Sequence, residues 1–334
     1  MKNLKKLHTF GIVVGARDVA FIESVADAVA FLRMKGPKVL LGRGADVFFC
    51  EDFQGTAGIV KTSGLKIQDE GELVRISAMA GEDWHGIVQK SCEAGLFQLA
   101  NLAYIPGTAG AAPVQNLGAY GSEFSDFCES LDILRPDGAI ENVKAENCGF
   151  GYRTSDLRNL APDDGIIWQI HLRLDKRANP NLTHGPLKQF ESEGHTPIEL
   201  MHKVMEIRRE KLPDPAEHGS AGSFFKNPIV SHELASSLKE KYPEMPTYDS
   251  DGGVKLAAGW LIDKAGLKGA TCGGAAIWSK QALVIVNMGD AVSSDVVNLA
   301  RMAKSEVLKK FGVRLTPEIR IFGAEGEIAG DSVI

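Results

Sequence analysis

The stretch Ile105–Gly121, which reads IPGTAGAAPVQNLGAYG, holds four glycines, and nearly all its other residues are small. Glycine has no Cβ, so another molecule can approach its backbone closely. Peptide N–H groups in turns and at helix starts bind phosphate and other anions. A glycine-rich surface loop is the common alternative, but a second such turn, Gly42-Arg43-Gly44-Ala45-Asp46, lies upstream. Two turns of this kind predict a large ligand with several acceptor groups, such as a dinucleotide.

The upstream turn differs from the dinucleotide-binding fingerprint of Rossmann domains. Residues Gly42–Val47 nearly match G-x-G-x-x-G, but Val47 takes the place of the third glycine. The fingerprint also requires a helix after the glycines, whereas Phe48-Phe49-Cys50 continues as a strand. The pattern favours a dinucleotide held outside a Rossmann unit, with two ordinary turns as the alternative.

A serine and two charged residues are candidates for the chemistry itself. Ser223 lies in Gly219–Pro228 (GSAGSFFKNP), which has no G-x-S-x-G elbow of a hydrolase. Arg153 and Glu318 stand beside glycine and proline, where most charged residues are simply solvated. If the two meet, Arg153 can grip a substrate carboxylate by paired hydrogen bonds, and Glu318 can act as an acid or an electrostatic partner.

Composition restricts the classes of partner. The chain has 334 residues, of which 44% are hydrophobic and 24% charged, with a formal net charge of −6. This is an ordinary soluble composition of about two domains, and the acidic balance argues against nucleic acid as the main partner. Five cysteines without C-x-x-C spacing, and histidines without ligand spacing, predict no metal site and a reducing compartment. Without an export signal or an apolar run of membrane length, we expect a cytoplasmic protein.

Hydrophobic periodicity and capping signals predict the elements that position these residues. Helices are predicted at residues 24–34, 82–94, 196–212, 232–241, 255–265 and 294–311. Strands are predicted at residues 38–41, 57–61, 73–80, 129–135, 140–143, 165–174, 282–287 and 313–322. The segment 129–143 is an antiparallel hairpin, so the mixture favours an α+β fold over a doubly wound sheet. Two prolines in Leu212-Pro213-Asp214-Pro215 indicate a domain boundary.

The order of these motifs resembles that of the UDP-N-acetylenolpyruvoylglucosamine reductase family, the flavoenzymes of peptidoglycan precursor synthesis. The similarity runs from Thr9-Phe10-Gly11 nearly to the C-terminus. The motifs that carry it are Ile105–Gly121, Gly151-Tyr152-Arg153, Lys211-Leu212-Pro213-Asp214-Pro215, Ala221–Pro228, Lys255–Asp263 and Pro317-Glu318-Ile319-Arg320. Each motif alone is modest evidence, whereas the full set in this order is a specific signal.

The resemblance implies an FAD-binding region of the vanillyl-alcohol-oxidase type in two subdomains, followed by an α+β substrate domain. On this chain the FAD-binding subdomains are residues 1–62 and 63–212, the substrate domain is 213–312, and 313–334 returns to the FAD-binding region. FAD is bound non-covalently, and we expect a monomer. The implied FAD contacts are Gly42, Gly44, Ala45, Asp46, Pro106, Gly107, Thr108, Gly110, Ala111, Ala112, Gln115, Asn116, Gly118, Ala119, Tyr120, Gly121 and Arg153.

The resemblance also implies the reaction. NADPH reduces FAD, and a hydride then reaches the terminal alkene carbon of UDP-N-acetylglucosamine enolpyruvate, which becomes UDP-N-acetylmuramate. Arg153 and Glu318 resemble the pair that stabilises the enol-like intermediate, and Ser223 matches the proton donor. The implied substrate contacts are His184, Arg208, Lys211, Asn227, Tyr248, Lys268 and Gln281, with Tyr248 on a loop that covers the site and Lys211, Asn227 and Gln281 at the diphosphate.

Two positions depart from the family pattern. His184 stands where the family has a tyrosine, and it still has a donor for phosphate and gains charge when protonated. Ala45-Asp46 replaces the usual Ser-Asn, so a carboxylate is introduced near the expected FAD phosphates. We expect the backbone rather than the side chains of Ala45 and Asp46 to serve FAD.

Two other functions stay open on the sequence. One is an FAD oxidase of the same flavin-binding superfamily, whose relatives often attach flavin covalently, and the set Lys211, Ser223 and Asn227 disfavours it. The other is a nucleotide-sugar-binding module without turnover, which the presence of Arg153, Ser223 and Glu318 disfavours.

Overall fold

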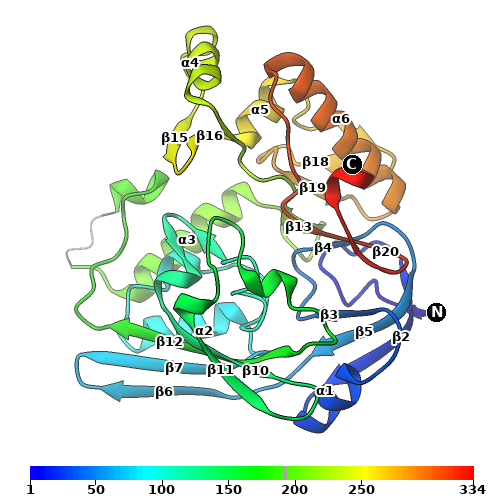
Figure 1. The fold of residues 1–334 in the computed structure, drawn as a ribbon. Helices are drawn as coiled ribbons and strands as arrows, with labels where there is room; N and C mark the ends of the chain where they lie inside the picture. The colour runs from blue at the N-terminus through cyan, green and yellow to red at the C-terminus, as the bar shows by residue number, and fades with distance from the viewer. Residues whose placement is uncertain (191–193) are drawn as a thin grey trace. The chain divides into compact units, whose positions relative to one another are not determined.

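The computed structural model describes residues 1–190 and 194–334, and the chain divides into two compact units (Figure 1). Unit 1 comprises Met1–Arg17, Gly44–Gln54 and Lys211–Ile334. Unit 2 comprises Asp18–Arg43 and Gly55–Glu210. The boundaries of these two units differ from those of the four segments expected from the family resemblance. Those segments are defined by cofactor and substrate binding, and they stay a prediction.

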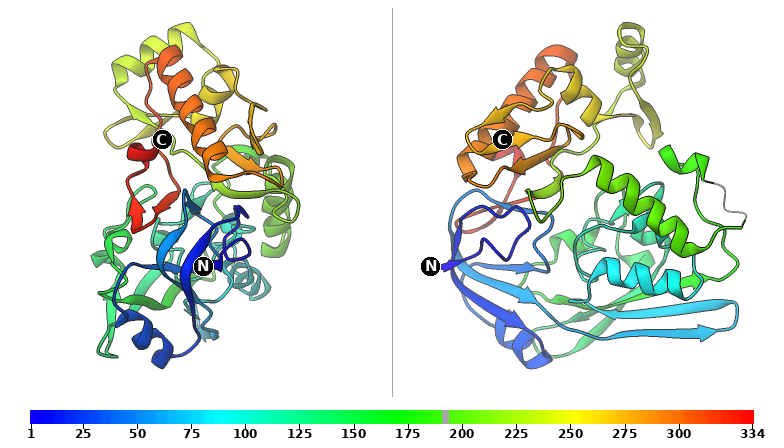
Figure 2. Two further views of the ribbon diagram at one scale, coloured as in Figure 1. Left: turned by 90° about the vertical axis from the view of Figure 1, so that its right-hand side faces the viewer. Right: turned by 180° about the vertical axis from the view of Figure 1, so that it is seen from behind.

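Unit 2 is built on a five-stranded antiparallel sheet with the order β11-β10-β12-β7-β6. The strands are β6 (Leu65–Glu70), β7 (Leu73–Met79), β10 (Cys128–Leu134), β11 (Ile140–Lys144) and β12 (Ile166–Asp175). Buried and partly exposed residues alternate along β7, as expected when one face meets a core and the other faces water. Figure 2 shows α2 (Trp84–Glu93) and α3 (Pro197–Lys211) on the core side, where Trp84 and Leu200 pack with Ile76 and Ile170.

Local signals explain why α3 begins where it does. The Thr196 Oγ1 accepts the N–H of Glu199 at 3.2 Å, and the Glu199 carboxylate accepts the N–H of Thr196 at 2.7 Å. This reciprocal capping box, with Pro197 in the first turn, is the one the sequence predicts. The helix carries Arg208 near its C-terminal end.

A second sheet has the order β1-β2-β5-β3, with β1 (Lys2–Asn3), β2 (Gly15–Ile22), β3 (Lys38–Leu41) and β5 (Phe53–Val60). By their residue ranges, β2 and β5 each begin in unit 1 and continue in unit 2. The helix α1 (Val25–Leu32) is followed by β3, and the buried Lys38 ammonium donates to the carbonyls of Leu32 and Met34 at 2.6 and 2.8 Å. Those bonds satisfy carbonyls at the C-terminal end of α1.

Unit 1 contains three small sheets with the orders β13-β19-β18-β17, β14-β16-β15 and β21-β20-β4. Their strands are β4 (Val47–Phe49), β13 (Gly219–Ser223), β14 (Ile229–Val230), β15 (Thr247–Ser250), β16 (Gly253–Leu256), β17 (Thr271–Cys272), β18 (Ala275–Ile277), β19 (Val284–Asn287), β20 (Arg320–Gly323) and β21 (Gly326–Ile328). The helices are α4 (His232–Lys241), α5 (Ala258–Lys264), α6 (Ser293–Phe311) and α7 (Gly330–Val333). The helix α6 packs against α5, β17 and β18, and β20 pairs in parallel with β4.

The remaining elements of the described chain are short. They are β8 (Gly118–Ala119), β9 (Ser122–Glu123), and the 3-10 helices η1 (Ala100–Leu102), η2 (Phe124–Asp126), η3 (Ala145–Asn147), η4 (Asp156–Asn159) and η5 (Gly185–Gln189). None of the helices in residues 1–190 and 194–334 combines the length and the apolar character needed to cross a membrane.

The α+β class is confirmed, because antiparallel sheets, parallel pairs and separate helices occur together. Two predicted elements are wrong in part. Lys255–Leu256 ends the strand β16 instead of starting a helix, since it pairs with Thr247–Tyr248, and α5 begins at Ala258. Of the strand predicted at 313–322, only Arg320 onward pairs as β20, and Pro317 makes a single bridge to Phe225.

Candidate functional site

The segment Ile105–Gly121 lies in unit 2, and most of its central N–H groups are already used by the protein. Ala109 and Gly110 donate to the carbonyls of Glu82 and Ala80, both at 2.9 Å. Ala111 and Ala112 donate to the Thr108 carbonyl at 3.0 and 3.2 Å. The expectation of exposed N–H donors is therefore wrong for these four residues. Their assignment as FAD contacts stays a prediction, and such contacts would use atoms other than these N–H groups.

Two glycines assigned to FAD contacts are needed by the protein's own packing. A Cβ on Gly42 would lie 2.3 Å from the Thr108 Oγ1, and one on Gly110 would lie 2.7 Å from the Ala80 Cβ. Gly107 differs, because its φ of +146° favours glycine while its Cβ position meets no atom within 4 Å. Because Gly42 and Gly110 have no Cβ, the end of β3 can approach Thr108 closely and the 107–112 segment can approach Ala80 closely.

Four residues other than glycine have a left-handed backbone among the described residues. They are Tyr104, Asn116, Tyr120 and Arg153, with φ between +45° and +57°. Bulky residues in this region carry strain, and such residues gather at functional sites. Three of the four belong to the residues predicted from the sequence, and the fourth, Tyr104, contacts Arg208.

Arg153 is held over the backbone of the glycine-rich segment. Its Nη2 donates to the Gly118 carbonyl at 2.7 Å, and its Cζ lies 5.5 Å from the centre of the Tyr152 ring. A Cβ on Gly118 would lie 2.8 Å from the Arg153 Nη1. Gly118 therefore makes room for the guanidinium, so these two predicted FAD contacts lie against each other.

Asn116 and Gln115 have structural partners. The buried Asn116 amide donates to Glu123 Oε2 at 2.8 Å and to the Gly151 carbonyl at 3.1 Å, and its Oδ1 accepts the Ser125 N–H at 2.9 Å. Gln115 Oε1 accepts from Arg158 at 2.8 Å. Asn116 ties the glycine-rich segment to the turn that carries Arg153, so its side chain positions this part of the site.

Arg208 brings a second cation into the same neighbourhood. Its Nε donates to the Tyr104 carbonyl at 3.1 Å, and its guanidinium lies close to the Tyr120 hydroxyl. Burial lowers the pKa of Arg208, and Arg153 lowers it further by like-charge repulsion. Burial raises the pKa of Tyr120. Among the described residues no carboxylate pairs with Arg208, so this partly buried cation is suited to an anionic ligand.

The turn Gly44–Asp46 lies in unit 1, packed against residues 7–9. The Thr9 Oγ1 donates to the Ser220 carbonyl at 2.6 Å and also lies 3.3 Å from the carbonyls of Gly44 and Ala45. A Cβ on Gly44, whose φ is +62°, would lie 2.5 Å from the Leu7 carbonyl oxygen. The Asp46 carbonyl accepts the Arg320 N–H at 3.0 Å, so the backbone of this turn is fixed from both sides.

His8, which the sequence did not single out, is 4% exposed behind this turn. Its Nε2 lies 3.3 Å from the Ile12 carbonyl oxygen, and its buried Nδ1 has no hydrogen-bond partner in the described part of the chain. Burial lowers the pKa of His8 to about 4, so the imidazole is neutral at pH 7. The unusual state of His8 follows from its burial in the folded chain, and no local sequence motif indicates it.

Ser223 and Glu318 are neighbours in unit 1. Ser223 ends β13 after an irregularity in its pairing with β19, and Gly222 in that bulge has a φ of +76°. Such a bulge turns the following side chain out of the regular alternation. The Glu318 N–H donates to the carbonyl of Phe224, the residue after Ser223, at 2.9 Å. The predicted serine and glutamate therefore lie on adjacent segments.

Three predicted diphosphate contacts surround one turn of unit 1. The Lys211 carbonyl accepts the Trp278 indole N–H at 3.0 Å, and the turn that follows Trp278 carries Gln281. Gln281 Oε1 would lie 2.6 Å from a Cβ on Gly259 in the first turn of α5, and Asn227 Oδ1 accepts the adjacent Ala258 N–H at 2.9 Å. Asn227 thus presents its amide NH₂ as a donor, as a diphosphate requires.

The other predicted substrate residues are distributed over both units. Tyr248 is 42% exposed on β15, and Lys268 forms an ion pair with Asp263 at 3.2 Å, both in unit 1. His184 is exposed in unit 2, where its Cβ would lie 3.4 Å from a Cβ on Gly121. Residues 1–190 and 194–334 contain no group of three His, Cys, Asp or Glu side chains suited to a metal ion.

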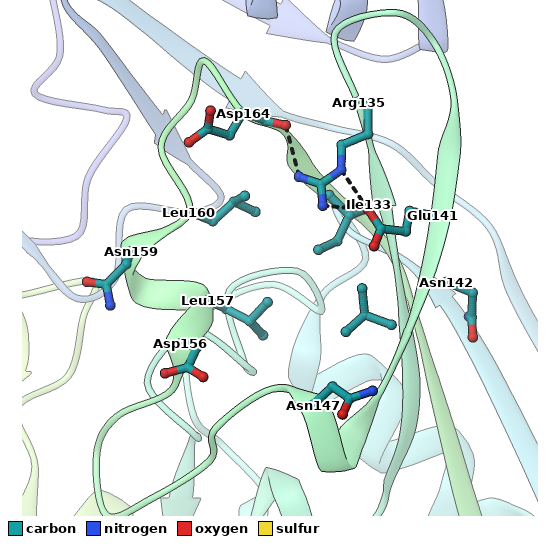
Figure 3. A pocket seen from close by; sticks show the side chains of 11 residues that line it. Ile133, Arg135, Glu141, Asn142, Asn147, Asp156, Leu157, Asn159, Leu160 and Asp164 are labelled. Carbon is teal, nitrogen blue, oxygen red and sulfur yellow. Dashed lines mark hydrogen bonds and ion pairs between the residues drawn. The ribbon is translucent and has the colours of Figure 1, made fainter.

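An open pocket of about 690 Å³ in unit 2 lies beside β10, β11 and η4 (Figure 3). Its lining includes Asn142, Asn147 and Asp156, and Arg135 hydrogen-bonds Glu141 and the Asp164 carbonyl there. None of the predicted site residues lines this pocket.

The chain is similar to known proteins over nearly its whole length. A family model described as an FAD binding domain matches residues 18–144, and one described as UDP-N-acetylenolpyruvoylglucosamine reductase, C-terminal domain, matches residues 214–322. The chain is 41% identical to the UDP-N-acetylenolpyruvoylglucosamine reductase of Pasteurella multocida over 100% of both chains. It is also 41% identical to that of Escherichia coli, over 99% of both. The crystal structure of UDP-N-acetylenolpyruvylglucosamine reductase from Thermus caldophilus is similar with a TM-score of 0.67 and 26% identity, covering 96% of this chain and 97% of that one.

Proposed function

Because this chain belongs to the UDP-N-acetylenolpyruvoylglucosamine reductase family, we propose that Ser223, Arg153 and Glu318 are the residues with which it reduces its substrate. The chain is an FAD-dependent oxidoreductase, and its reaction is the NADPH-dependent reduction of UDP-N-acetylglucosamine enolpyruvate to UDP-N-acetylmuramate in peptidoglycan synthesis. The contact of Glu318 with Phe224, beside Ser223, supports the assignment of the catalytic residues most directly.

The residues present suit FAD. The backbones of Asn116 and Tyr120 are left-handed, and the Cβ position of Gly107 meets no atom within 4 Å, which leaves space beside this irregular segment. Arg208 adds a cation that has no carboxylate partner among the described residues. We assign FAD to this segment of unit 2 and to the Gly44–Asp46 turn of unit 1. When bound, FAD would supply the redox chemistry that carries a hydride from NADPH to the terminal alkene carbon of the substrate.

The chain's own residues then stabilise charge and supply a proton. Negative charge develops on the substrate carboxylate and the carbon beside it, and the Arg153 guanidinium donates hydrogen bonds to that carboxylate. Glu318 acts with Arg153 to stabilise the enol-like intermediate. The Ser223 hydroxyl gives its proton to the substrate carbon beside the carboxylate. A hydroxyl is a weak acid, so its placement must compensate for its pKa. The convergence of Arg153 from unit 2 with Ser223 and Glu318 from unit 1 is part of the proposal.

The substrate's diphosphate is assigned to Lys211, Asn227 and Gln281, which surround the turn after Trp278. Lys211 supplies a point charge and the two amides supply donors. We assign His184, Arg208, Tyr248 and Lys268 to the same ligand, and Lys268 must leave Asp263 to reach it. A monomer in the cytoplasm is also part of this proposal.

The test compares Ser223→Ala with Ser220→Ala on the same strand. The contacts of Ser220 with Thr9 run through its backbone, so Ser220→Ala keeps them and serves as the matched control. Mixed anaerobically with NADPH, both variants should lose the flavin absorbance at the wild-type rate. On addition of the enolpyruvyl sugar nucleotide, Ser223→Ala should recover its absorbance at least ~100-fold more slowly, since a general acid contributes about 10²–10⁴-fold. Near-normal recovery in Ser223→Ala contradicts the assignment.

A further inference from the structure

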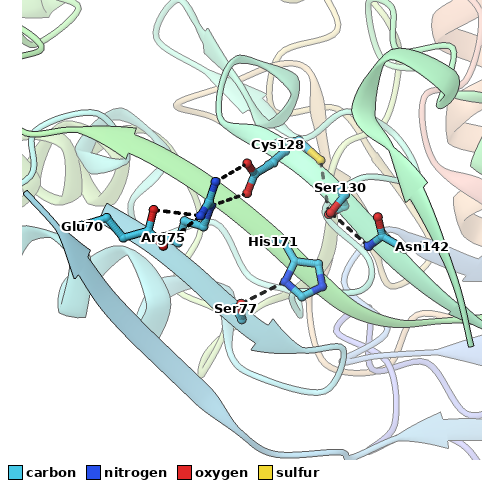
Figure 4. Close-up of polar contacts among 8 residues, drawn as sticks. Glu70, Arg75, Ser77, Cys128, Ser130, Asn142 and His171 are labelled. Atoms are coloured by element: carbon cyan, nitrogen blue, oxygen red, sulfur yellow. Dashed lines mark hydrogen bonds and ion pairs between the residues drawn. The ribbon is translucent and has the colours of Figure 1, made fainter. Parts of the chain in front are cut away.

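A hydrogen-bonded row of serine, histidine and aspartate crosses the face of the five-stranded sheet that turns away from the core, and Figure 4 shows its Ser77–His171 pair. Ser77 on β7 is paired with His171 on β12, and the Ser77 Oγ lies 2.9 Å from the His171 Nδ1. The His171 Nε2 lies 2.9 Å from Asp132 Oδ2 on β10. None of the three belongs to the proposed FAD or substrate residues.

The partners of this row determine where its protons lie. Asp132 Oδ1 accepts from the Asn142 amide at 2.7 Å, which orients the carboxylate so that Oδ2 faces the imidazole. An ionised carboxylate only accepts hydrogen bonds, so in the neutral imidazole the His171 Nε2 carries the ring proton and Nδ1 keeps its lone pair. The Ser77 hydroxyl must then be the donor to Nδ1. A hydroxyl that donates to a base, which is itself oriented by a carboxylate, is the arrangement of an activated nucleophile.

The row is both held and accessible. The side chains of His171 and Asp132 are 22% and 18% exposed, and Ser77 is partly exposed. The three strands are bonded neighbours in one sheet, so the groups do not depend on a mobile loop.

Positive charge lies on the same face of the sheet. Arg75, two residues before Ser77, is neutralised by Glu70 and Glu129, and Figure 4 shows its contact with Glu70. Lys66 on β6 is the direct cross-strand partner of Ser77, is exposed, and forms no ion pair within the described residues. Lys66 is therefore a cation available to stabilise an oxyanion formed beside Ser77.

We propose that Ser77 is a nucleophile for small activated acyl and phosphonyl compounds, with His171 as its general base and Asp132 as the positioning residue. With an activated ester, the Ser77 Oγ forms a bond to the carbonyl carbon while its proton moves to the His171 Nδ1. The bond from that carbon to the alcohol oxygen breaks, and His171 returns the proton to the leaving alkoxide. Water then attacks the acyl-serine by the same route and releases the acid, so no oxidant or reductant is required. This reaction is independent of the reductase function and uses none of its residues.

The experiment treats the holoenzyme with a fluorophosphonate and locates the adduct by peptide mass spectrometry. We expect a label on Ser77, with a labelling rate at least ~100-fold lower in His171→Gln, since loss of a general base costs about 10²–10⁴-fold. The matched control is Ser130→Ala, because Ser130 lies on the same face but accepts from Asn142 at 3.1 Å and has no activating imidazole bond. Ser130→Ala and Ser223→Ala should both label at the wild-type rate, and Ser77→Ala should keep full NADPH oxidation. Absence of the label from Ser77, or equal labelling in His171→Gln, overturns the proposal and leaves the row a purely structural network.

Discussion

Acid should destabilise this protein through His8. In the folded chain the pKa of His8 lies at about 4 because the ring is buried, against 6.5 for an ordinary histidine. Between pH 6.5 and 4 the unfolded chain therefore binds a proton that the folded chain does not, and the free energy of unfolding falls as the pH falls. The slope of 1.36 kcal/mol per pH unit gives a loss of about 2 kcal/mol at pH 5 and about 3 kcal/mol at pH 4, relative to pH 7.5.

The variant His8→Gln isolates this effect, since its amide can still donate to the Ile12 carbonyl that His8 Nε2 contacts at 3.3 Å. Urea unfolding is followed by tryptophan fluorescence at pH 7.5 and pH 5, and flavin fluorescence reports the release of FAD. The loss of unfolding free energy between these pH values should be about 2 kcal/mol larger in the wild type than in the variant. FAD release should follow, because residues 7–9 support the Gly44–Asp46 turn. Equal losses in both proteins refute the argument from burial.

Two further predictions concern the proposed site. Gly118→Ala places a Cβ 2.8 Å from the Arg153 Nη1 and should lower kcat by about 10²-fold, as for a catalytic group displaced by about 1 Å. Flavin reduction by NADPH should be unchanged. An unaltered kcat in steady-state assays contradicts the conclusion that Gly118 positions the Arg153 guanidinium for catalysis. Affinity for the UDP-sugar should rise modestly as the pH falls through the histidine range in the wild type but not in His184→Tyr, because protonation adds a charge facing phosphate. Calorimetric measurement of UDP-sugar binding at several pH values checks this prediction. The same pH dependence in both proteins contradicts a direct contact between His184 and the phosphate.

Local signals predicted much of the fold. The capping box of Thr196 and Glu199 and the helix His232–Lys241 depend on neighbouring residues, and both are found where expected. The segment 255–265 misleads because Lys255 belongs to a strand whose partner, Tyr248, is supplied by a separate stretch of chain. Helical periodicity does not reveal such pairing.

The candidate site shows the same division between local and long-range information. The sequence singled out Gly118 and Arg153 as FAD contacts, which stays a prediction, but it did not reveal that the Arg153 guanidinium lies against Gly118. Glycines look alike in a sequence whether a ligand or the protein itself approaches them. His8 could not be found, because its burial depends on how residues 7–9 pack on the distant Gly44–Asp46 turn.

The proposed mechanism depends most on where the side chains of Arg153, Ser223 and Glu318 lie in the complex with FAD and the enolpyruvyl sugar nucleotide. A crystal structure of that complex, prepared with Ser223→Ala to slow turnover, measures this directly. We predict that the Arg153 guanidinium and the Glu318 carboxyl group lie within contact distance of the enolpyruvyl carboxylate. The Cβ of residue 223 should face the substrate carbon next to that carboxylate, from the side opposite the flavin ring or from the edge of that ring. A substrate bound with any of the three pointing to a different surface contradicts the account.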